Sequence, residues 1–335
     1  MSFYETAVER LQYGYRDFWD SHGSECVNDL PLLAGGPWKV LVIVGIYLWF
    51  VKWKGPEMMK NREPYHIKPY VIAHNVFLVL LHLILYPLGL WSTDFGYSCW
   101  ECKRIDIHHP VHGHKEYMAL MLGYVYFLTK FFELADTVFF VLRKKQAHVS
   151  TLHVFHHASM PIFCYLAAKF STWHTVGWVA MLNAFVHIVM YSYYTLAALG
   201  VQRWLWLKKY ITQLQIFQFV LILIHAMYFL QKQNCGWPMI FRVMQFGHGL
   251  QFLYMFSSFY VRTYWKKPSH NASALNVPSN TNGVSNSALN GDKTNAVCGN
   301  GNLKTNDIVN GNGIGNDVIA NGLMNDLPTK ALKQE

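Results

Sequence analysis

Three histidines lie within five residues of one another, in the sequence His153-Val-Phe-His156-His157. On a helix, with about 100° between successive residues, their imidazoles share an arc of about 100°. Imidazole is the commonest metal ligand, and without a metal a neutral imidazole serves as a nucleophile or general base. The spacing therefore indicates either a metal site or histidine-based catalysis on one helix face.

A second group of chemically capable residues precedes the histidines in an apolar stretch. Lys130, Glu133, Asp136 and Thr137 would occupy an arc of roughly 120° on a helix. Charged side chains within a membrane span are costly, which makes them candidates for function. A structural ion-pair network between helices is the alternative interpretation.

Two further polar groups follow at helical spacing. The first has His187, Tyr191 and Tyr194 in one stripe, and its members are Asn183, His187, Met190, Tyr191, Tyr193 and Tyr194. The second is a polar track with the spacing i, i+3, i+6, made of Thr212, Gln215 and Gln218. Any one such stripe also occurs as an ordinary contact between membrane helices.

The elements that must position these groups are long apolar segments. Of the 335 residues, 52% are hydrophobic and 14% are charged, whereas soluble proteins carry about 25% charged residues. This composition excludes a disordered chain and favours a membrane protein. Seven stretches have about the 20 mostly apolar residues that cross a bilayer. They are Leu33–Val51, Tyr70–Trp91, Tyr117–Leu142, Leu152–Phe170, Val176–Leu199, Ile211–Leu230 and Met239–Val261.

We therefore expect an all-α integral membrane protein with seven transmembrane helices between residues 33 and 267. Residues 1–32 form a lumenal segment before the first helix. Residues 268–335 form an Asn- and Gly-rich tail without apolar periodicity, and we expect it to be disordered in the cytosol.

The distribution of Lys and Arg sets the orientation. Positive residues collect in the loops after the first, third, fifth and seventh stretches. The opposite side has Lys169 and Lys232 in two loops, and elsewhere its positive residues are mixed with a larger number of acids; these positive residues are Arg10, Arg16, Lys103, Arg104 and Lys115. Because cytoplasmic loops collect Lys and Arg, we expect a lumenal N-terminus and a cytosolic C-terminus. This topology brings all four polar groups to one depth, in the cytosolic half of the bundle. We infer a single polar site.

The cysteines indicate a disulfide bond on the lumenal side. Cys26, Cys99, Cys102 and Cys235 all fall there, in an environment where disulfides persist. We favour a bond to Cys235 from Cys102 or from Cys99.

Two other classes of protein share parts of this pattern. A membrane di-iron desaturase or hydroxylase also uses an H-x-x-H-H element, but it needs several histidine boxes. The second histidine cluster of this chain lies in the opposite, lumenal loop and consists of His108, His109, His112 and His114. A seven-span receptor has the same topology but does not need the buried charges. We expect no metal at the polar site, and both classes remain alternative functions.

The four polar groups, in order, resemble the signatures of the very-long-chain fatty acid elongase family. Lys130 to Thr137 matches K-x-x-E-x-x-D-T, and His153 to His157 matches H-x-x-H-H. His187 to Tyr194 matches H-x-x-M-Y-x-Y-Y, and Thr212 to Gln218 matches T-x-x-Q-x-x-Q. The likeness extends from about Asn61 to Tyr264. The H-x-x-H-H element alone is a weak signal, whereas the ordered set of four is a strong one.

The resemblance implies a fold and a reaction. Six of seven helices would surround a narrow tunnel for an acyl chain, in the membrane of the endoplasmic reticulum. The enzyme would condense a long-chain or very-long-chain acyl-CoA with malonyl-CoA and release CoA and carbon dioxide. The product, a 3-oxoacyl-CoA, would result from the first step of the elongation cycle.

The histidines would carry this reaction by a ping-pong route. His156 would take the acyl group as an acyl-imidazole, and His187 would act as its partner or base. His153 and His157 would position them. Glu133 or Asp136 would fix a tautomer. These six residues are our catalytic candidates.

The remaining polar residues are candidates for substrate binding. Those within the helices are Lys130, Thr137, Asn183, Met190, Tyr191, Tyr193, Tyr194, Thr212, Gln215 and Gln218. At the cytosolic mouth, Arg143, Lys144 and Lys145 would meet the phosphates of CoA. Positive-inside topology alone is the alternative reason for those three charges.

The resemblance also implies partners. We expect no cofactor beyond the two CoA substrates, and no nucleic acid. The partners would be membrane lipids and the ketoreductase, dehydratase and enoyl reductase that complete the cycle, together with a possible second copy of this chain.

Overall fold

The computed structural model describes residues 10, 12–108, 111, 113–170 and 174–265. The tail predicted over residues 268–335, and the histidines at positions 109 and 112, lie outside these described residues. Within them the regular structure is helical, and turns and irregular segments such as residues 60–67 and 101–108 connect the helices.

Each of the seven apolar stretches corresponds to a long helix. They are α3 (Trp38–Trp49), α5 (Lys68–Ser92), α6 (Gly113–Leu142), α7 (Thr151–Phe170), α8 (Thr175–Leu199), α9 (Lys208–Gln231) and α10 (Met239–Tyr260). α3 continues through the π-helical turn η3 (Phe50–Lys54) into α4 (Gly55–Met59), and α10 continues into η7 (Val261–Trp265). The short elements are η1 (Tyr13–Asp17), α2 (Phe18–His22), η2 (Glu25–Val27), η4 (Tyr97–Trp100), η5 (Gln146–His148) and η6 (Gln202–Leu207).

Among the residues that the structure describes, three helices have the length and composition to cross a bilayer. These are α5, α8 and α9. α3 has only 12 residues before its π-helical continuation, and α6 carries three charged side chains in its second half. The all-α membrane protein predicted from the composition is therefore confirmed, while the number of spans stays a prediction.

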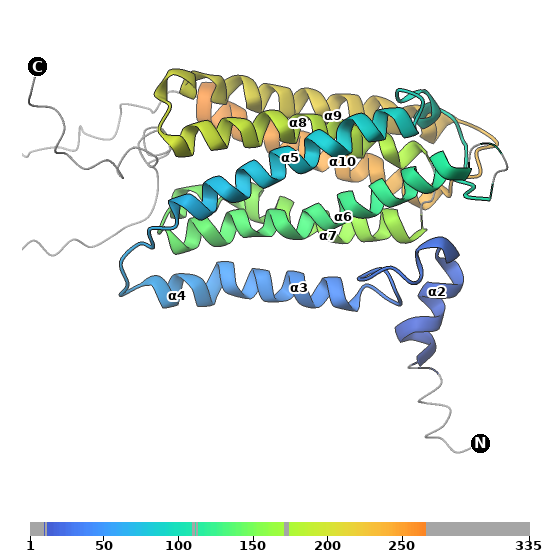
Figure 1. Ribbon diagram of the computed structural model, residues 1–335, viewed down its shortest axis with the longest axis horizontal. Helices are drawn as coiled ribbons and strands as arrows, with labels where there is room; N and C mark the ends of the chain where they lie inside the picture. The colour runs from blue at the N-terminus through green and yellow to red at the C-terminus, as the bar shows by residue number, and fades with distance from the viewer. Residues whose placement is uncertain (1–9, 11, 109–110, 112, 171–173, 266–335) are drawn as a thin grey trace, which may run out of the picture.

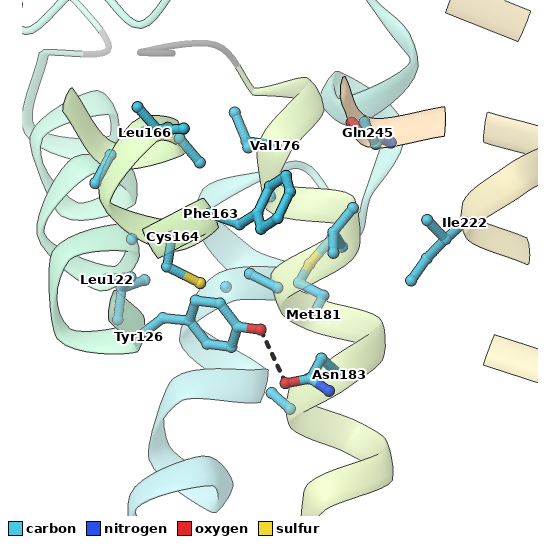
Figure 2. Close-up of a pocket in the computed structure, with 18 of the residues that line it drawn as sticks. Leu122, Tyr126, Phe163, Cys164, Leu166, Val176, Met181, Asn183, Ile222 and Gln245 are labelled. Carbon is cyan, nitrogen blue, oxygen red and sulfur yellow. Dashed lines mark hydrogen bonds between the residues drawn. The ribbon is translucent and has the colours of Figure 1, made fainter. Parts of the chain in front are cut away.

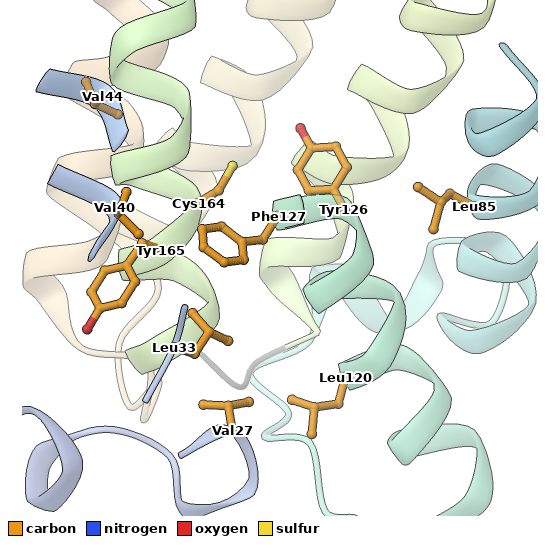
Figure 3. Packing of buried hydrophobic residues seen from close by; sticks show 10 residues of the cluster. All are labelled: Val27, Leu33, Val40, Val44, Leu85, Leu120, Tyr126, Phe127, Cys164 and Tyr165. Atoms are coloured by element: carbon orange, nitrogen blue, oxygen red, sulfur yellow. The ribbon is translucent and has the colours of Figure 1, made fainter. Parts of the chain in front are cut away.

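The long helices pack side by side as an elongated bundle (Figure 1). α5 packs along α8, α9 along α10, and α6 along α7. α3 lies outside this group and contacts α7. A buried apolar cluster joins α3 to the bundle and includes Val40, Val44, Phe127 and Tyr165 (Figure 3).

The turns at one end of the bundle are held by specific contacts. Cys102 and Cys235 form a disulfide bond. The sequence left Cys99 and Cys102 open as partners of Cys235, and the structure shows that the partner is Cys102. Cys99 is a buried free thiol in η4. Arg242, at the start of α10, donates hydrogen bonds to the carbonyl groups of Phe229, Lys232, Cys235 and Trp237. Because buried carbonyl groups need donors, Arg242 stabilises the turn between α9 and α10.

The lysine that we assigned to a lumenal loop is buried instead. Lys169 is in the last turn of α7 and is 0% exposed. The prediction that Lys169 is an exposed loop residue was wrong. The chain before α3 folds over this end of α7, and its oxygen atoms accept hydrogen bonds from the Lys169 ammonium group.

Candidate active site

Glu133 is the centre of a buried charged cluster. It is 1% exposed, and its Oε1 lies 2.6 Å from Lys130 Nζ, one turn away on α6. His187 Nδ1 on α8 lies 3.1 Å from the same oxygen, and His82 Nε2 on α5 lies 3.8 Å away. Three helices are therefore joined through one carboxylate.

His82, Glu133 and His187 are arranged as metal ligands could be, but Lys130 already balances the charge of Glu133. The ligand atoms of His82, Glu133 and His187 all lie within 4.8 Å of one another. However, the Lys130 ammonium group contacts Glu133 Oε1 directly, so a metal ion bound here would stand beside a buried positive charge. The donor set therefore fits an ion pair with oriented imidazoles, not a resident metal.

Asn183 links the charged cluster to a cavity. Its Oδ1 accepts hydrogen bonds from Lys130 Nζ at 3.0 Å and from the Tyr126 hydroxyl at 2.8 Å (Figure 2). With the oxygen held by two donors, the amide nitrogen is the end left to donate. Asn183 lines the cavity, so its side chain can offer a donor to a bound carbonyl group.

Asp136 and Thr137 form a second connection between helices. The Tyr191 hydroxyl donates to Asp136 Oδ2 at 2.7 Å, and His74 Nε2 lies 3.0 Å from Oδ1. Thr137 Oγ1 lies 3.0 Å from His153 Nε2 and 2.8 Å from the Tyr47 hydroxyl. The polar face predicted on α6 thus contacts α3, α5, α7 and α8.

The three histidines of α7 are adjacent, as their spacing predicted. The ring centroids of His153 and His157 are 4.3 Å apart, and those of His156 and His157 are 5.3 Å apart. His156 packs against Phe252 and lines the cavity. Nδ1 of His157 is buried without a hydrogen-bond partner among the described residues.

The acids orient a different set of imidazoles from the one in α7. Glu133 contacts His82 and His187, and Asp136 contacts His74. The link from this polar network to His153 runs through the hydroxyl of Thr137. Glu133 is thus the acid nearest to His187, although the 3.1 Å contact does not have hydrogen-bond geometry and His187 Nδ1 has no hydrogen-bond partner among the described residues.

An apolar cavity of about 240 Å³ extends from this site into the bundle. Side chains of α5 to α10 line it, with His156, Asn183 and Gln218 among the few polar ones. Phe163, Met181 and Ile222 reach it from three different helices (Figure 2). His156 and Ala168 both line it, and the 12 helical steps from one to the other along α7 span about 18 Å at 1.5 Å per residue.

The remaining candidates lie around this centre. Gln215 Nε2 contacts Met190 Sδ at 3.4 Å, and the Thr212 hydroxyl donates to the carbonyl of Lys208 at 3.2 Å. Both contacts are structural. The rings of Tyr191 and Tyr194 have centroids 5.9 Å apart, and those of Tyr193 and Tyr194 are also 5.9 Å apart. The structure thus brings Gln218 to the cavity, sets Gln215 against Met190 of α8, and gives Thr212 a hydrogen bond within α9.

The basic residues lie where α6 ends. Lys144 has a positive φ of 54° and donates to the carbonyl of Lys60 at 3.3 Å. Nearby, burial, with the ammonium groups of Lys208 and Lys145, lowers the pKa of His148 to about 4. Arg143, Lys144 and Lys145 therefore form the positive charge next to the start of α7.

Four residues of the network were not singled out in the sequence. They are Tyr47 of α3, His74 and His82 of α5, and Tyr126 of α6. A signal existed for the two histidines, since His74 and His82 lie eight residues apart in an apolar stretch, which puts them about 80° apart around a helix. The two tyrosines had no such signal, because tyrosine is frequent throughout this chain.

Comparison with known proteins gives a consistent result. The sequence matches the family described as "ELO: GNS1/SUR4 family" over residues 32–272. It is 38% identical over 287 residues to the human very long chain fatty acid elongase 4, covering 84% of this chain and 88% of that protein. It is 33% identical over 287 residues to the Drosophila melanogaster very long chain fatty acid elongase 7, covering 83% of this chain and 84% of that protein. It is 34% identical over 249 residues to the mouse very long chain fatty acid elongase 1, covering 73% of this chain and 88% of that protein.

Proposed function

This chain belongs to the ELO family, and we propose that it is a condensing enzyme of very-long-chain fatty acid elongation. It joins a long-chain or very-long-chain acyl-CoA to malonyl-CoA and forms a 3-oxoacyl-CoA two carbons longer than the acyl group. The observation that carries the proposal is the cavity, which has His156 and Asn183 among its polar lining residues and an otherwise largely apolar wall. Such a cavity suits an alkyl chain whose carbonyl group meets an imidazole.

The first half of the reaction transfers the acyl group to the enzyme. A ring nitrogen of His156 attacks the thioester carbon, the carbon–sulfur bond breaks, and CoA leaves as the thiol with the proton that the imidazole loses. The amide nitrogen of Asn183 is available to donate to the carbonyl oxygen as negative charge develops on it. The acyl group is then held as an acyl-imidazole.

The second half forms the new carbon–carbon bond. Malonyl-CoA loses carbon dioxide, and the electron pair of the broken bond becomes an enolate of the thioester. The enolate attacks the acyl carbon and the carbon–nitrogen bond breaks, so that His156 leaves as an imidazolate. This anion takes up one proton from water, which replaces the proton that left with CoA and restores the neutral imidazole. Decarboxylation supplies the nucleophile, so no strong base is needed. His187, whose Nδ1 lies 3.1 Å from Glu133 Oε1, is the partner imidazole.

The buried ion pair supports this chemistry indirectly. Lys130 balances the charge of Glu133 and also fixes Asn183. Through these contacts it orients both the amide group and His187. Lys130 is therefore a positioning residue.

The membrane arrangement that fits this function has seven spans in the endoplasmic reticulum, with a lumenal N-terminus and a cytosolic C-terminus. Six helices, α5 to α10, enclose the acyl tunnel, and α3 stands outside. Arg143, Lys144 and Lys145 meet the CoA phosphates on the cytosolic side, since Arg and Lys bind phosphate strongly. A ketoreductase, a dehydratase and an enoyl reductase then process the product.

The test is a condensation assay with the purified full-length protein in lipid nanodiscs, labelled malonyl-CoA and a series of acyl-CoAs. We expect labelled 3-oxoacyl-CoA and one equivalent of carbon dioxide per product. Formation of neither product with any acyl-CoA would refute the proposal. A lipid oxidation that needs oxygen and iron would instead favour a di-iron enzyme.

A further inference from the structure

Two side chains from the segment before α3 line the end of the cavity that is far from His156. Val27 is 1% exposed and Leu33 is 0% exposed, and both line the same cavity as His156. They pack in one cluster with Leu120 and Tyr165 (Figure 3). The segment between α2 and α3 therefore forms part of the cavity wall.

A buried lysine holds this segment against the bundle. Lys169 Nζ donates to Asp20 Oδ1 at 2.6 Å, to Asn28 Oδ1 at 2.7 Å and to the carbonyl of Leu33 at 2.9 Å. The backbone N–H of Ser24 donates to the carbonyl of Lys169 at 2.9 Å. Since an unpaired buried ammonium group is very costly, the position of the segment is tied to these contacts.

Two further hydrogen bonds fix the same segment at Gly35, shortly before α3. Asp20 Oδ1 also accepts from the backbone N–H of Gly35 at 3.0 Å, and the Tyr165 hydroxyl donates to the carbonyl of Gly35 at 2.7 Å. At Gly23 a side chain has no room, because a Cβ atom there would lie 2.7 Å from Lys169 Cε. The segment is thus a rigid part of the wall.

We propose that this segment is the closed end of the acyl cavity and that Val27 and Leu33 limit the length of the acyl chain. The inference rests on the proposed function and adds the residues that determine specificity. Lys169 acts through them as a positioning residue. From His156 to Ala168 the cavity extends about 18 Å. An extended chain advances about 1.2 Å per bond, so this distance holds roughly 15 bonds.

The expected effect of each substitution follows from its carbon count. One round of elongation adds two carbons, which is also the difference between valine and alanine. Val27→Ala therefore makes room for about one more round, and Leu33→Ala for at least one. Val27→Phe fills the end and shortens the longest chain that is extended.

The experiment measures product length with each variant as the full chain in nanodiscs. Saturated acyl-CoAs of increasing length are offered with labelled malonyl-CoA. We expect the longest product to gain two carbons with Val27→Ala and to lose at least two with Val27→Phe. The matched control is Val40→Ala, because Val40 is 0% exposed in the same cluster but does not line the cavity. We expect the control to leave product length unchanged.

Lys169 is tested by the spread of product lengths. Lys169→Met removes the three donated hydrogen bonds, so we expect a broader length distribution at a similar rate with short acyl-CoAs. Lys169→Arg keeps the charge and the donors and should restore part of the wild-type distribution.

The outcomes separate this inference from the proposed function. Wild-type condensation with an unchanged length limit in Val27→Ala, Leu33→Ala and Val27→Phe would overturn the inference and leave the proposed function intact. An equal shift with Val40→Ala would also overturn it, because general loosening would then explain the change. Absence of condensation by the wild type would overturn both.

Discussion

Removing the Lys130 ammonium group tests whether the buried ion pair supports the site. In Lys130→Met the side chain keeps a similar length but loses its charge. Glu133 loses its 2.6 Å partner and Asn183 loses a 3.0 Å donor. Breaking one partner of a buried pair costs about 3–5 kcal/mol, because the other charge is left uncompensated.

The free energy of unfolding can be measured by detergent titration of the protein in mixed micelles. We expect Lys130→Met to lower it by about 3–5 kcal/mol. Glu133→Gln should have a smaller cost, because the amide oxygen still accepts a hydrogen bond. In the double variant the two effects should not add, with an interaction energy of about 1–3 kcal/mol.

Condensation activity gives an independent measurement of the same substitution. Lys130→Met should lower kcat more than it raises KM, because Asn183 and His187 lose their orientation while the cavity keeps its shape. Lys52→Met is the control, since Lys52 is an exposed lysine in η3. A loss of less than about 1 kcal/mol for Lys130→Met, the value of an exposed pair, would refute the buried ion pair.

Three other predictions concern parts of the fold outside the charged cluster. Because burial and two nearby lysines lower the pKa of His148 to about 4, the unfolded state binds a proton below about pH 6.5 that the folded state does not bind. The stability of the wild type relative to His148→Gln should be constant above pH 6.5 and fall by up to about 3 kcal/mol towards pH 4; a pH-independent difference would contradict this. Arg242→Met leaves carbonyl groups without a donor and should cost at least about 2 kcal/mol of unfolding free energy, whereas an unchanged unfolding midpoint would show that water replaces the guanidinium. Cys102→Ser removes the disulfide bond with Cys235 and should cost about 2–4 kcal/mol, and the effect should disappear when both proteins are compared under reducing conditions.

Much of the fold could be predicted from the apolar stretches. All seven became helices because a segment of that length and composition has no other way to satisfy its backbone in lipid. The polar groups of α6, α7 and α8 also meet, as the shared depth indicated. What periodicity could not supply is the identity of the partners.

The pairing within the site depends on tertiary contacts that a single segment does not encode. Glu133 has imidazoles of two other helices within reach, and the helical arc alone could not select His82 and His187 over the histidines of α7. His82 was overlooked because it is an isolated polar residue in a stretch that is otherwise mostly apolar, whereas the other polar groups are clustered. The segment before α3 was treated as separate from the helices, yet Val27 and Leu33 are buried in the bundle. Their position in the cavity wall depends on tertiary contacts, such as the hydrogen bonds from Lys169 to Asn28 and Leu33, which the sequence does not show.

The most direct test of the central claim is whether His156 carries the acyl group. Full-length protein is incubated with a long-chain acyl-CoA without malonyl-CoA, quenched, digested and analysed by peptide mass spectrometry. We expect the acyl mass on the peptide that contains His156 and its loss when malonyl-CoA is added before the quench, with no adduct in His156→Ala. An adduct found only on a cysteine, or no adduct while condensation proceeds at full rate, would contradict the histidine acyl-enzyme.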